Sequence, residues 1–333
     1  MPELYINSDW SYRGLHAVIL ENRYLRAVIL PQLGGKIWQI TYKPLDTNLL
    51  WNNGRIPPSR LPMNARYDDV WCGGWDELFP NDEISRIDGE SYPDHGELWT
   101  ADWKAETFEE RDAVGVVLSV RTPISSIYVE KTITLRVDQS RLQFHHKFTN
   151  EGVGTFPFLW KLHPAFAVSP KHRIDFPPMK VTLEPGFPGT LGDAGSPFEW
   201  PYAQIGDRKI DVRRIPHIAE RQLYFFYGTE MKESWCAITN TETGLACGLY
   251  FDPNVFSSCW LFASYGGWRN YNVAVLEPCT GFPLNFETMQ KEGRARTLEP
   301  GKSLTTEVLF SVQPDTHAVG KMKADGTLTE PVR

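Results

Sequence analysis

Short apolar runs broken by turn residues recur along the whole chain, without the three-to-four-residue spacing of a long amphipathic helix. The N-terminal runs predict a meander of three strands, with breaks at Glu21-Asn22 and at 31–35. All predicted strands are 16–20, 24–30, 36–42, 114–121, 127–137, 141–149, 159–168, 222–227, 235–239, 245–251, 273–277 and 303–312. This pattern is typical of an all-β protein built from antiparallel sheets that pack face to face.

One segment, 51–104, breaks this rhythm because it is rich in Gly, Pro, Asp and Trp. Long irregular segments of a compact domain are commonly functional loops, so we expect site residues here. No internal repeat and no linker-like stretch divides the 333 residues. The sequence therefore predicts a single domain over 1–333, in which the polar stretch 313–333 forms a surface tail.

Composition narrows the class of protein. Hydrophobic residues make up 41% and charged residues 23%, as in ordinary soluble globular proteins. A net charge of -7 without a basic face argues against nucleic acid as a partner and favours small neutral or polar molecules. Neither a signal-peptide pattern nor a membrane-spanning apolar run is present, so we predict a cytoplasmic protein that does not bind membranes.

The cysteines and aromatic residues add two expectations. The five cysteines are scattered and form no C-x-x-C pair, which argues against a zinc site or a disulfide framework. The chain has 12 Trp, 13 Tyr and 18 Phe, and aromatic faces suit the C–H faces of sugars. Because many of these rings must be core, the composition alone gives sugar binding only weak support.

The strand at 159–168 carries the first candidate for chemistry. Alternation along a strand puts Lys161 and His163 on one face and Trp160 and Leu162 on the other. An imidazole on a rigid strand can serve as a general acid, and a lone histidine can equally be a buried packing residue.

Two further residues complete a possible acid-base set. Glu277 ends an apolar strand, and Pro278 after it favours an extended backbone. His95 lies inside the irregular segment. Opening a sugar ring requires one group that protonates the ring oxygen and another that takes the proton from the anomeric hydroxyl. Nothing in the spacing alone brings His95, His163 and Glu277 together.

In four segments the sequence resembles the aldose 1-epimerases, or galactose mutarotases. These are the opening hairpin at 20–38, Pro93-Asp94-His95-Gly96, Lys161-Leu162-His163-Pro164-Ala165-Phe166 and Leu276-Glu277-Pro278, in the family's order from about residue 15 to 312. The segment Gly73-Gly74-Trp75-Asp76-Glu77 looks more like a divergent branch of the superfamily than like true galactose mutarotases.

The resemblance implies a β-supersandwich fold, a sugar as the small-molecule partner and no metal or organic cofactor. It implies that Glu277 is the general base on the anomeric hydroxyl and that His163 is the general acid toward the ring oxygen. His95 is implied as a second contact to that oxygen. We expect a monomer or a homodimer that interconverts the anomers of a hexose or modified hexose.

Substrate-binding candidates come from residue chemistry and from the resemblance. Asp76 and Glu77 could accept hydrogen bonds from vicinal hydroxyls or cap a turn, and Asp252 is the candidate for the family's sugar-binding aspartate. Trp75 and Trp99 could stack on a sugar or pack in the core. Arg66 and Arg269 could meet an anionic substituent or carry surface charge.

Two other functions remain open. One is a noncatalytic protein that binds or senses carbohydrate, because a fold does not fix a function. The other is a lyase or hydrolase on the same fold. A hydrolase is expected to use two carboxylates, whereas this set is histidine plus glutamate, which favours the epimerase.

Overall fold

The computed structural model describes residues 3–187 and 189–331. It contains two compact units, one formed by the chain up to Pro164 with Thr280–Glu307, the other by Ala165–Cys279 with the chain from Val308. Strands make up 51% of the chain and helices 5%, which confirms the all-β prediction. The expectation of a single domain stays a prediction, and the two units are described separately.

One sheet of the first unit contains the predicted meander as β2 (Leu15–Asn22), β3 (Leu25–Leu30) and β4 (Lys36–Tyr42), and a further strand, β1 (Leu4–Tyr12), lies at its edge. The strands, in their spatial order, are β1, β2, β3, β4, β6 (Trp75–Leu78) and β14 (Lys161–Ala167). Each pair is antiparallel, and the short β5 (Thr47–Asn48) pairs with β4. Only the first four residues of β14 belong to this unit.

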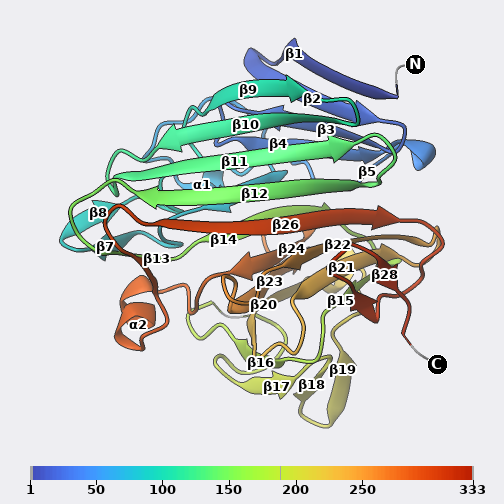
Figure 1. The fold of residues 1–333 in the computed structure, drawn as a ribbon. Helices are drawn as coiled ribbons and strands as arrows, with labels where there is room; N and C mark the ends of the chain where they lie inside the picture. The colour runs from blue at the N-terminus through green and yellow to red at the C-terminus, as the bar shows by residue number, and fades with distance from the viewer. Residues whose placement is uncertain (1–2, 188, 332–333) are drawn as a thin grey trace. The chain divides into compact units, whose positions relative to one another are not determined.

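The other sheet of the first unit is a row of four antiparallel strands, seen side by side in Figure 1. They are β9 (Lys104–Glu109), β10 (Ala113–Arg121), β11 (Ile127–Arg136) and β12 (Arg141–Asn150). Burial alternates strictly along β11, because one face of the strand packs inward. β10 and β11 contact β2, so the two sheets enclose a core that includes Ile133, Leu135 and Phe144.

Strand β6 is one of several strands that the sequence pattern misses; β1 and β9 are others. Strand β6 lies within the irregular segment, directly after Gly73 and Gly74, and all four of its residues are buried. A strand buried on both faces shows no alternation of apolar and polar residues, so the pattern gives no signal for it. The smaller pairs of this unit are β7 (Ser85–Ile87) with β8 (Glu90–Tyr92) and β13 (Phe156–Phe158) with β25 (Arg296–Leu298).

The second unit contains two further sets of antiparallel strands. One set, in spatial order, is β24 (Asn272–Cys279), β23 (Ser258–Tyr265), β20 (Gln222–Thr229), β16 (Lys180–Leu183) and β17 (Pro197–Glu199). The other is β15 (His172–Asp175), β21 (Trp235–Asn240), β22 (Leu245–Phe251) and β26 (Ser303–Gln313), whose residues from Val308 pair with β22. A separate hairpin joins β18 (Tyr202–Ile205) and β19 (Arg208–Asp211).

The stretch 313–333 is not a surface tail as far as the structure describes it. It forms a hairpin of β27 (Lys321–Met322) and β28 (Leu328–Thr329), and its last two residues lie outside the described residues. Val319, Met322 and Leu328 are buried in one apolar cluster with Trp235 of β21. Three apolar side chains spaced among polar residues are enough to fix this stretch to the second unit.

In residues 3–187 and 189–331, helical structure is limited to four short segments. They are η1 (Lys43–Leu45), α1 (Tyr67–Val70), η2 (Ile218–Glu220) and α2 (Phe286–Lys291). Among the described residues, no helix has the length and apolar character needed to cross a membrane.

Candidate functional site

Strand β6 directs its side chains to two different environments. Trp75 and Glu77 point into the core between the two sheets, where Trp75 packs on Phe144 of β12 at 4.8 Å between ring centroids. Asp76, between them, points to the opposite face. It pairs across the ladder with His163 of β14, so these two side chains share that face.

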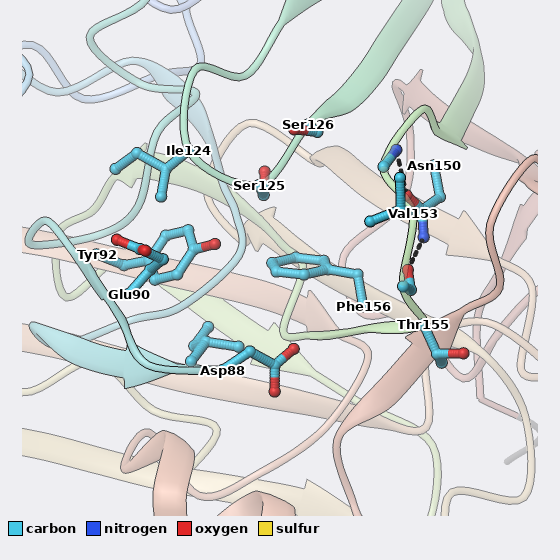
Figure 2. Close-up of a pocket in the computed structure, with 13 residues that line it drawn as sticks. Asp88, Glu90, Tyr92, Ile124, Ser125, Ser126, Asn150, Val153, Thr155 and Phe156 are labelled. Atoms are coloured by element: carbon cyan, nitrogen blue, oxygen red, sulfur yellow. Dashed lines mark hydrogen bonds between the residues drawn. The ribbon is translucent and has the colours of Figure 1, made fainter.

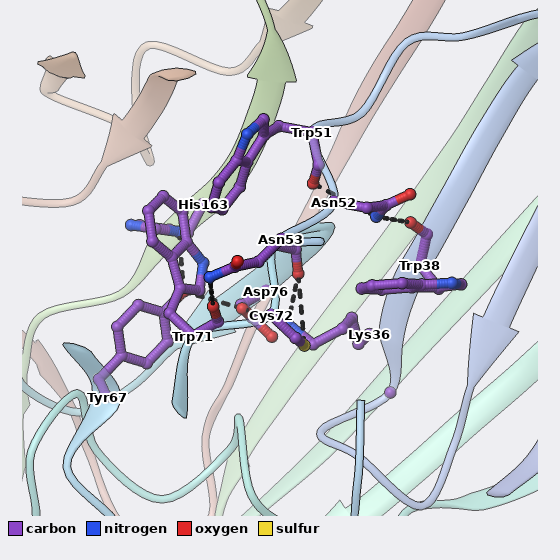
Figure 3. A network of polar contacts seen from close by, with 12 residues as sticks. Lys36, Trp38, Trp51, Asn52, Asn53, Tyr67, Trp71, Cys72, Asp76 and His163 are labelled. Carbon is purple, nitrogen blue, oxygen red and sulfur yellow. Dashed lines mark hydrogen bonds and ion pairs between the residues drawn. The ribbon is translucent and has the colours of Figure 1, made fainter. Parts of the chain in front are cut away.

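His163 is the end of a buried polar chain on this face. Lys36 Nζ lies 2.5 Å from Asp76 Oδ2, Tyr67 Oη donates to the same oxygen at 2.8 Å, and Tyr67 Oη lies 3.1 Å from His163 Nδ1. Figure 3 shows these four residues in one network. We call them, together with His95, the histidine cluster.

The surroundings of His163 favour the neutral imidazole. Its side chain is 5% exposed, and burial is the main cause that lowers its pKa well below the usual value. The positive charges of Lys161, His95 and Lys36 lower the pKa further. We therefore expect His163 to be neutral at neutral pH, with a proton on one ring nitrogen and a lone pair on the other.

His95 reaches the cluster from a tightly fixed loop. Its backbone is left-handed, with φ of 60°, and its N–H donates to Asp82 O at 2.6 Å. Gly96 follows with φ of 78°, and a Cβ there would lie 2.0 Å from Phe79 O, so only glycine fits. The loop therefore turns sharply here, and the His95 imidazole lies against the ring of Tyr67.

The charges around His95 favour the protonated imidazole. Burial lowers its pKa, but the charge of Asp82 and the hydrogen bond and charge of Asp94 outweigh burial and the opposing charge of Lys161, so the pKa is raised. Asp94 Oδ1 lies 2.8 Å from His95 Nδ1, and Lys161 forms an ion pair with Asp82. His95 and His163 thus have pKa values displaced in opposite directions.

Tyr67 joins the two imidazoles. Its ring stacks on His95 at 4.1 Å with 4° between the planes and meets His163 edge-on at 5.4 Å. The centroids of the two imidazoles are 6.4 Å apart. Within the described residues, neither Nε2 atom has a hydrogen-bond partner. Two open nitrogens of different basicity can give a proton to one ligand atom and accept one from another.

Indole rings flank this pair. Trp71 meets His163 edge-on at 5.7 Å, and Trp51 lies 4.8 Å from Trp71. Trp51 is partly exposed, so it is the better placed of the two for contact with a ligand. Such flat apolar faces beside polar groups are typical of pockets that bind small molecules.

Glu77 does not belong to this face, contrary to the expectation that it contacts sugar. Its side chain is 2% exposed, and Lys131 Nζ, His146 Nε2 and Trp160 Nε1 lie 3.0, 3.0 and 3.2 Å from its oxygens. Burial raises its pKa, but the charges of His146 and Lys131 lower it more, to about 2. Both Glu77 oxygens thus have partners inside the core. The ring of Trp75 is also buried there, against Phe144.

Trp99 and Arg66 support the cluster in other ways. Trp99 is 2% exposed, contacts Tyr67 edge-on at 4.9 Å and donates to Asp94 O at 2.9 Å. It therefore packs beneath the site and leaves little of its face for stacking on a ligand.

Arg66 is exposed directly before α1. Burial raises the pKa of Asp94, and the charge of Arg66 is one of the causes that lower it.

Three predicted site residues belong to the second unit. Glu277 is 1% exposed on β24, opposite Trp260 of β23, and its charge contributes to the raised pKa of the buried Cys259, after burial and Cys236. Asp252 Oδ1 accepts from Asn254 N at 2.8 Å, which is a turn-capping role. Arg269 is exposed and its guanidinium lies 5.0 Å from the ring centroid of Trp268.

Sequence reasoning did not assign several residues around the imidazoles to the site, among them Lys36, Tyr67, Asp82 and Lys161. The signal for Lys36 and Lys161 was present, because each lies in an apolar stretch, and a buried charge requires a partner. Tyr67 gave no such signal, since a tyrosine after a surface arginine resembles any other aromatic residue.

In the part of the chain that the structure describes, no group of three or more His, Cys, Asp or Glu side chains could hold a metal ion. All five cysteines are free and buried.

A separate pocket of about 190 Å³ lies elsewhere in the first unit. Figure 2 shows Tyr92 and Phe156 at this pocket together with Asp88, Ser125 and Asn150. None of its lining residues is a histidine, so it lacks the pair of titrating groups on which the candidate site depends.

Comparisons with known proteins support the fold. No family model matches the chain. A candidate aldose 1-epimerase from Escherichia coli K12 is similar in structure, with a TM-score of 0.66, 21% identity, and coverage of 90% of this chain and 100% of that one. A galactose mutarotase-like protein from Clostridium acetobutylicum has a TM-score of 0.66 at 12% identity, with coverage of 94% and 100%.

A second candidate aldose 1-epimerase, from Klebsiella pneumoniae subsp. pneumoniae, has a TM-score of 0.69 at 11% identity, with coverage of 93% and 83%. Identities this low establish the fold and leave the activity open. The predicted fold class is confirmed: the chain has the galactose mutarotase-like fold of antiparallel sheets.

Proposed function

We propose that this protein is an aldose 1-epimerase that interconverts the α and β anomers of a hexose or modified hexose. The observation that carries the proposal is the pair His95 and His163, whose open Nε2 atoms and opposite pKa displacements suit a proton donor and a proton acceptor. The names of the structural neighbours support the same class of reaction.

In this proposal Glu277, the base that the family resemblance implies, takes the proton from the anomeric hydroxyl while a histidine gives a proton to the ring oxygen. The bond between C1 and the ring oxygen breaks, its electron pair stays on that oxygen, and C1 becomes an aldehyde. Rotation about the C1–C2 bond and closure on the other face yield the other anomer, with the proton transfers reversed.

The test is anomer-resolved NMR exchange spectroscopy on a panel of free, phosphorylated, sulfonated and uronic hexoses. We expect wild type to accelerate exchange of at least one class. Glu277→Gln and the double variant His95→Ala with His163→Ala should each lose roughly a hundredfold or more, the scale of a lost general acid or base. Sugar binding, followed by calorimetry, should survive in Glu277→Gln.

Matched controls come from exposed residues of the same types. His145→Ala changes an exposed histidine of β12, and Glu242→Gln changes an exposed glutamate that pairs with Lys171. Both should exchange anomers at the wild-type rate. Binding of a sugar without accelerated exchange by wild type would overturn the epimerase and favour a carbohydrate-binding protein.

A further inference from the structure

The sequence resemblance implies that His163 is the general acid, but the hydrogen bonds around the two imidazoles favour a different assignment of their roles. We infer that His95 is the proton donor to the ring oxygen and that Tyr67 holds His163 as a neutral hydrogen-bond acceptor. This inference rests on the proposed function for its chemistry, whereas the state of His163 can be tested without any substrate.

The tautomer of His163 follows from counting protons on Tyr67. A tyrosine hydroxyl has one proton, and Tyr67 gives it to Asp76 Oδ2 at 2.8 Å. Asp76 is held by Lys36 Nζ at 2.5 Å, and a carboxylate in an ion pair only accepts hydrogen bonds. The contact of 3.1 Å between Tyr67 Oη and His163 Nδ1 therefore needs its proton from the histidine. His163 carries hydrogen on Nδ1 and a lone pair on Nε2.

Burial and several neighbouring positive charges disfavour a second proton on His163. Lys161 is its neighbour along β14, Lys36 lies beyond Asp76, and His95 is 6.4 Å away between ring centroids. Each of these groups adds positive charge, and the side chain is almost fully buried. His163 is thus suited to accept a hydrogen bond from a sugar hydroxyl and unsuited to protonate the ring oxygen.

His95 has the opposite arrangement. Asp94 Oδ1 accepts from its Nδ1 at 2.8 Å, so a proton on Nε2 completes the imidazolium. Burial and the charge of Lys161 oppose that cation, whereas the charges of Asp82 and Asp94 and the face of the Tyr67 ring at 4.1 Å favour it. The acidic proton then sits on the nitrogen that has no partner among the described residues.

The proton balance closes with these roles. The His95 Nε2 proton moves to the ring oxygen as the C1 bond breaks, and the imidazolium becomes neutral imidazole. The anomeric hydroxyl proton moves to Glu277, whose carboxylate becomes a carboxylic acid. Ring closure reverses both transfers. Tyr67 touches no reacting atom in this scheme and acts as a positioning residue through His163.

The tautomer test uses ¹⁵N-labelled histidine in the full-length protein and long-range ¹H–¹⁵N correlation spectra, with the His163 signals assigned by their loss in His163→Gln. We expect wild-type His163 at pH 7 to show a protonated Nδ1 and an unprotonated Nε2. Tyr67→Phe should lose this preference, while Tyr5→Phe, which changes an exposed tyrosine, should retain it. A protonated Nε2 on wild-type His163 would overturn the inference.

The activity test compares the two single variants on a sugar that wild type converts. His95→Gln should lose roughly a hundredfold or more in anomer exchange, as for a lost general acid. His163→Gln should lose only about tenfold, the scale of one hydrogen bond. The wild-type rate should fall as pH rises through the raised pKa of His95, and this limb should be absent in His95→Gln.

A larger loss in His163→Gln than in His95→Gln would overturn the inference while leaving the epimerase intact. A wild-type protein that accelerates no exchange would instead overturn the proposed function. In that case the labelled spectra still decide whether Tyr67 fixes the tautomer of His163, so the two failures are distinguishable.

Discussion

Two buried charge clusters of the first unit meet back to back at β6, and they differ in how they are completed. The core cluster of Glu77, Lys131, His146 and Trp160 surrounds one carboxylate with three donors. Within the described residues, the histidine cluster on the other face leaves two imidazole Nε2 atoms and Asp76 Oδ1 without a hydrogen-bond partner, whereas in the core cluster the buried His146 Nδ1 lacks one. The first arrangement links residues of β6, β11 and β12 in the core, whereas we propose that the second binds a polar ligand.

The largest expected effect tests the core cluster. Glu77→Gln removes the only carboxylate among its four members and leaves Lys131 and His146 uncompensated in the core. We expect a loss of roughly 3–5 kcal/mol in the free energy of unfolding, the usual cost of breaking a buried ion pair from one side. Urea denaturation measures it.

The control for this variant is Glu130→Gln on β11, whose partly exposed carboxylate lies 3.7 Å from Lys147. It should change the free energy of unfolding by less than about 1 kcal/mol. Equal losses in both variants would contradict a special role of the core cluster.

The pH dependence of stability gives the next largest effect. The folded-state pKa of Glu77 is about 2, below its ordinary value of 4.5. Its stabilisation is therefore complete above about pH 4.5 and is lost as pH falls toward 2, by roughly 3 kcal/mol in total. Urea denaturation at several pH values in this window should give a flatter profile for Glu77→Gln than for wild type. Parallel profiles would show that other groups control acid unfolding.

The smallest effect on stability belongs to the histidine cluster. Tyr67→Phe keeps the ring that stacks on His95 and removes only the hydroxyl between Asp76 and His163. Since Asp76 keeps Lys36, we expect a loss of about 1 kcal/mol, the typical net value of a hydrogen bond. Thermal unfolding followed by circular dichroism measures it. A loss as large as that of Glu77→Gln would show that the hydroxyl serves mainly to hold the fold.

The sequence predicted those strands whose apolar residues alternate or run between clear turns, as at β2 to β4 and β10 to β12, and it missed others such as β1, β9 and β23. It also placed Lys161 and His163 on one face of β14, opposite Trp160, and the structure confirms this through their contacts with Asp82, Tyr67 and Glu77. Local periodicity is enough for such statements.

The sequence could not assign Asp76 and Glu77 to different environments, because that requires β6 to be recognised as a strand. Nor could it bring His95 to Tyr67, since this contact depends on a loop and on the packing of segments distant in sequence. Periodicity describes one element at a time, whereas a site depends on which elements become neighbours.

The loop that carries His95 has a further consequence for affinity. Beyond the left-handed turn, Glu97 N donates to Phe79 O at 2.7 Å, and the Glu97 carboxylate accepts from the backbone of Ile124 and Ser125 at 2.7 and 3.2 Å. A segment fastened at so many points has little conformational freedom left to lose when a ligand arrives. A mobile loop loses conformational entropy when it binds a ligand, whereas this loop has already lost that entropy on folding. Such preorganisation favours high affinity for any small molecule that binds beside His95.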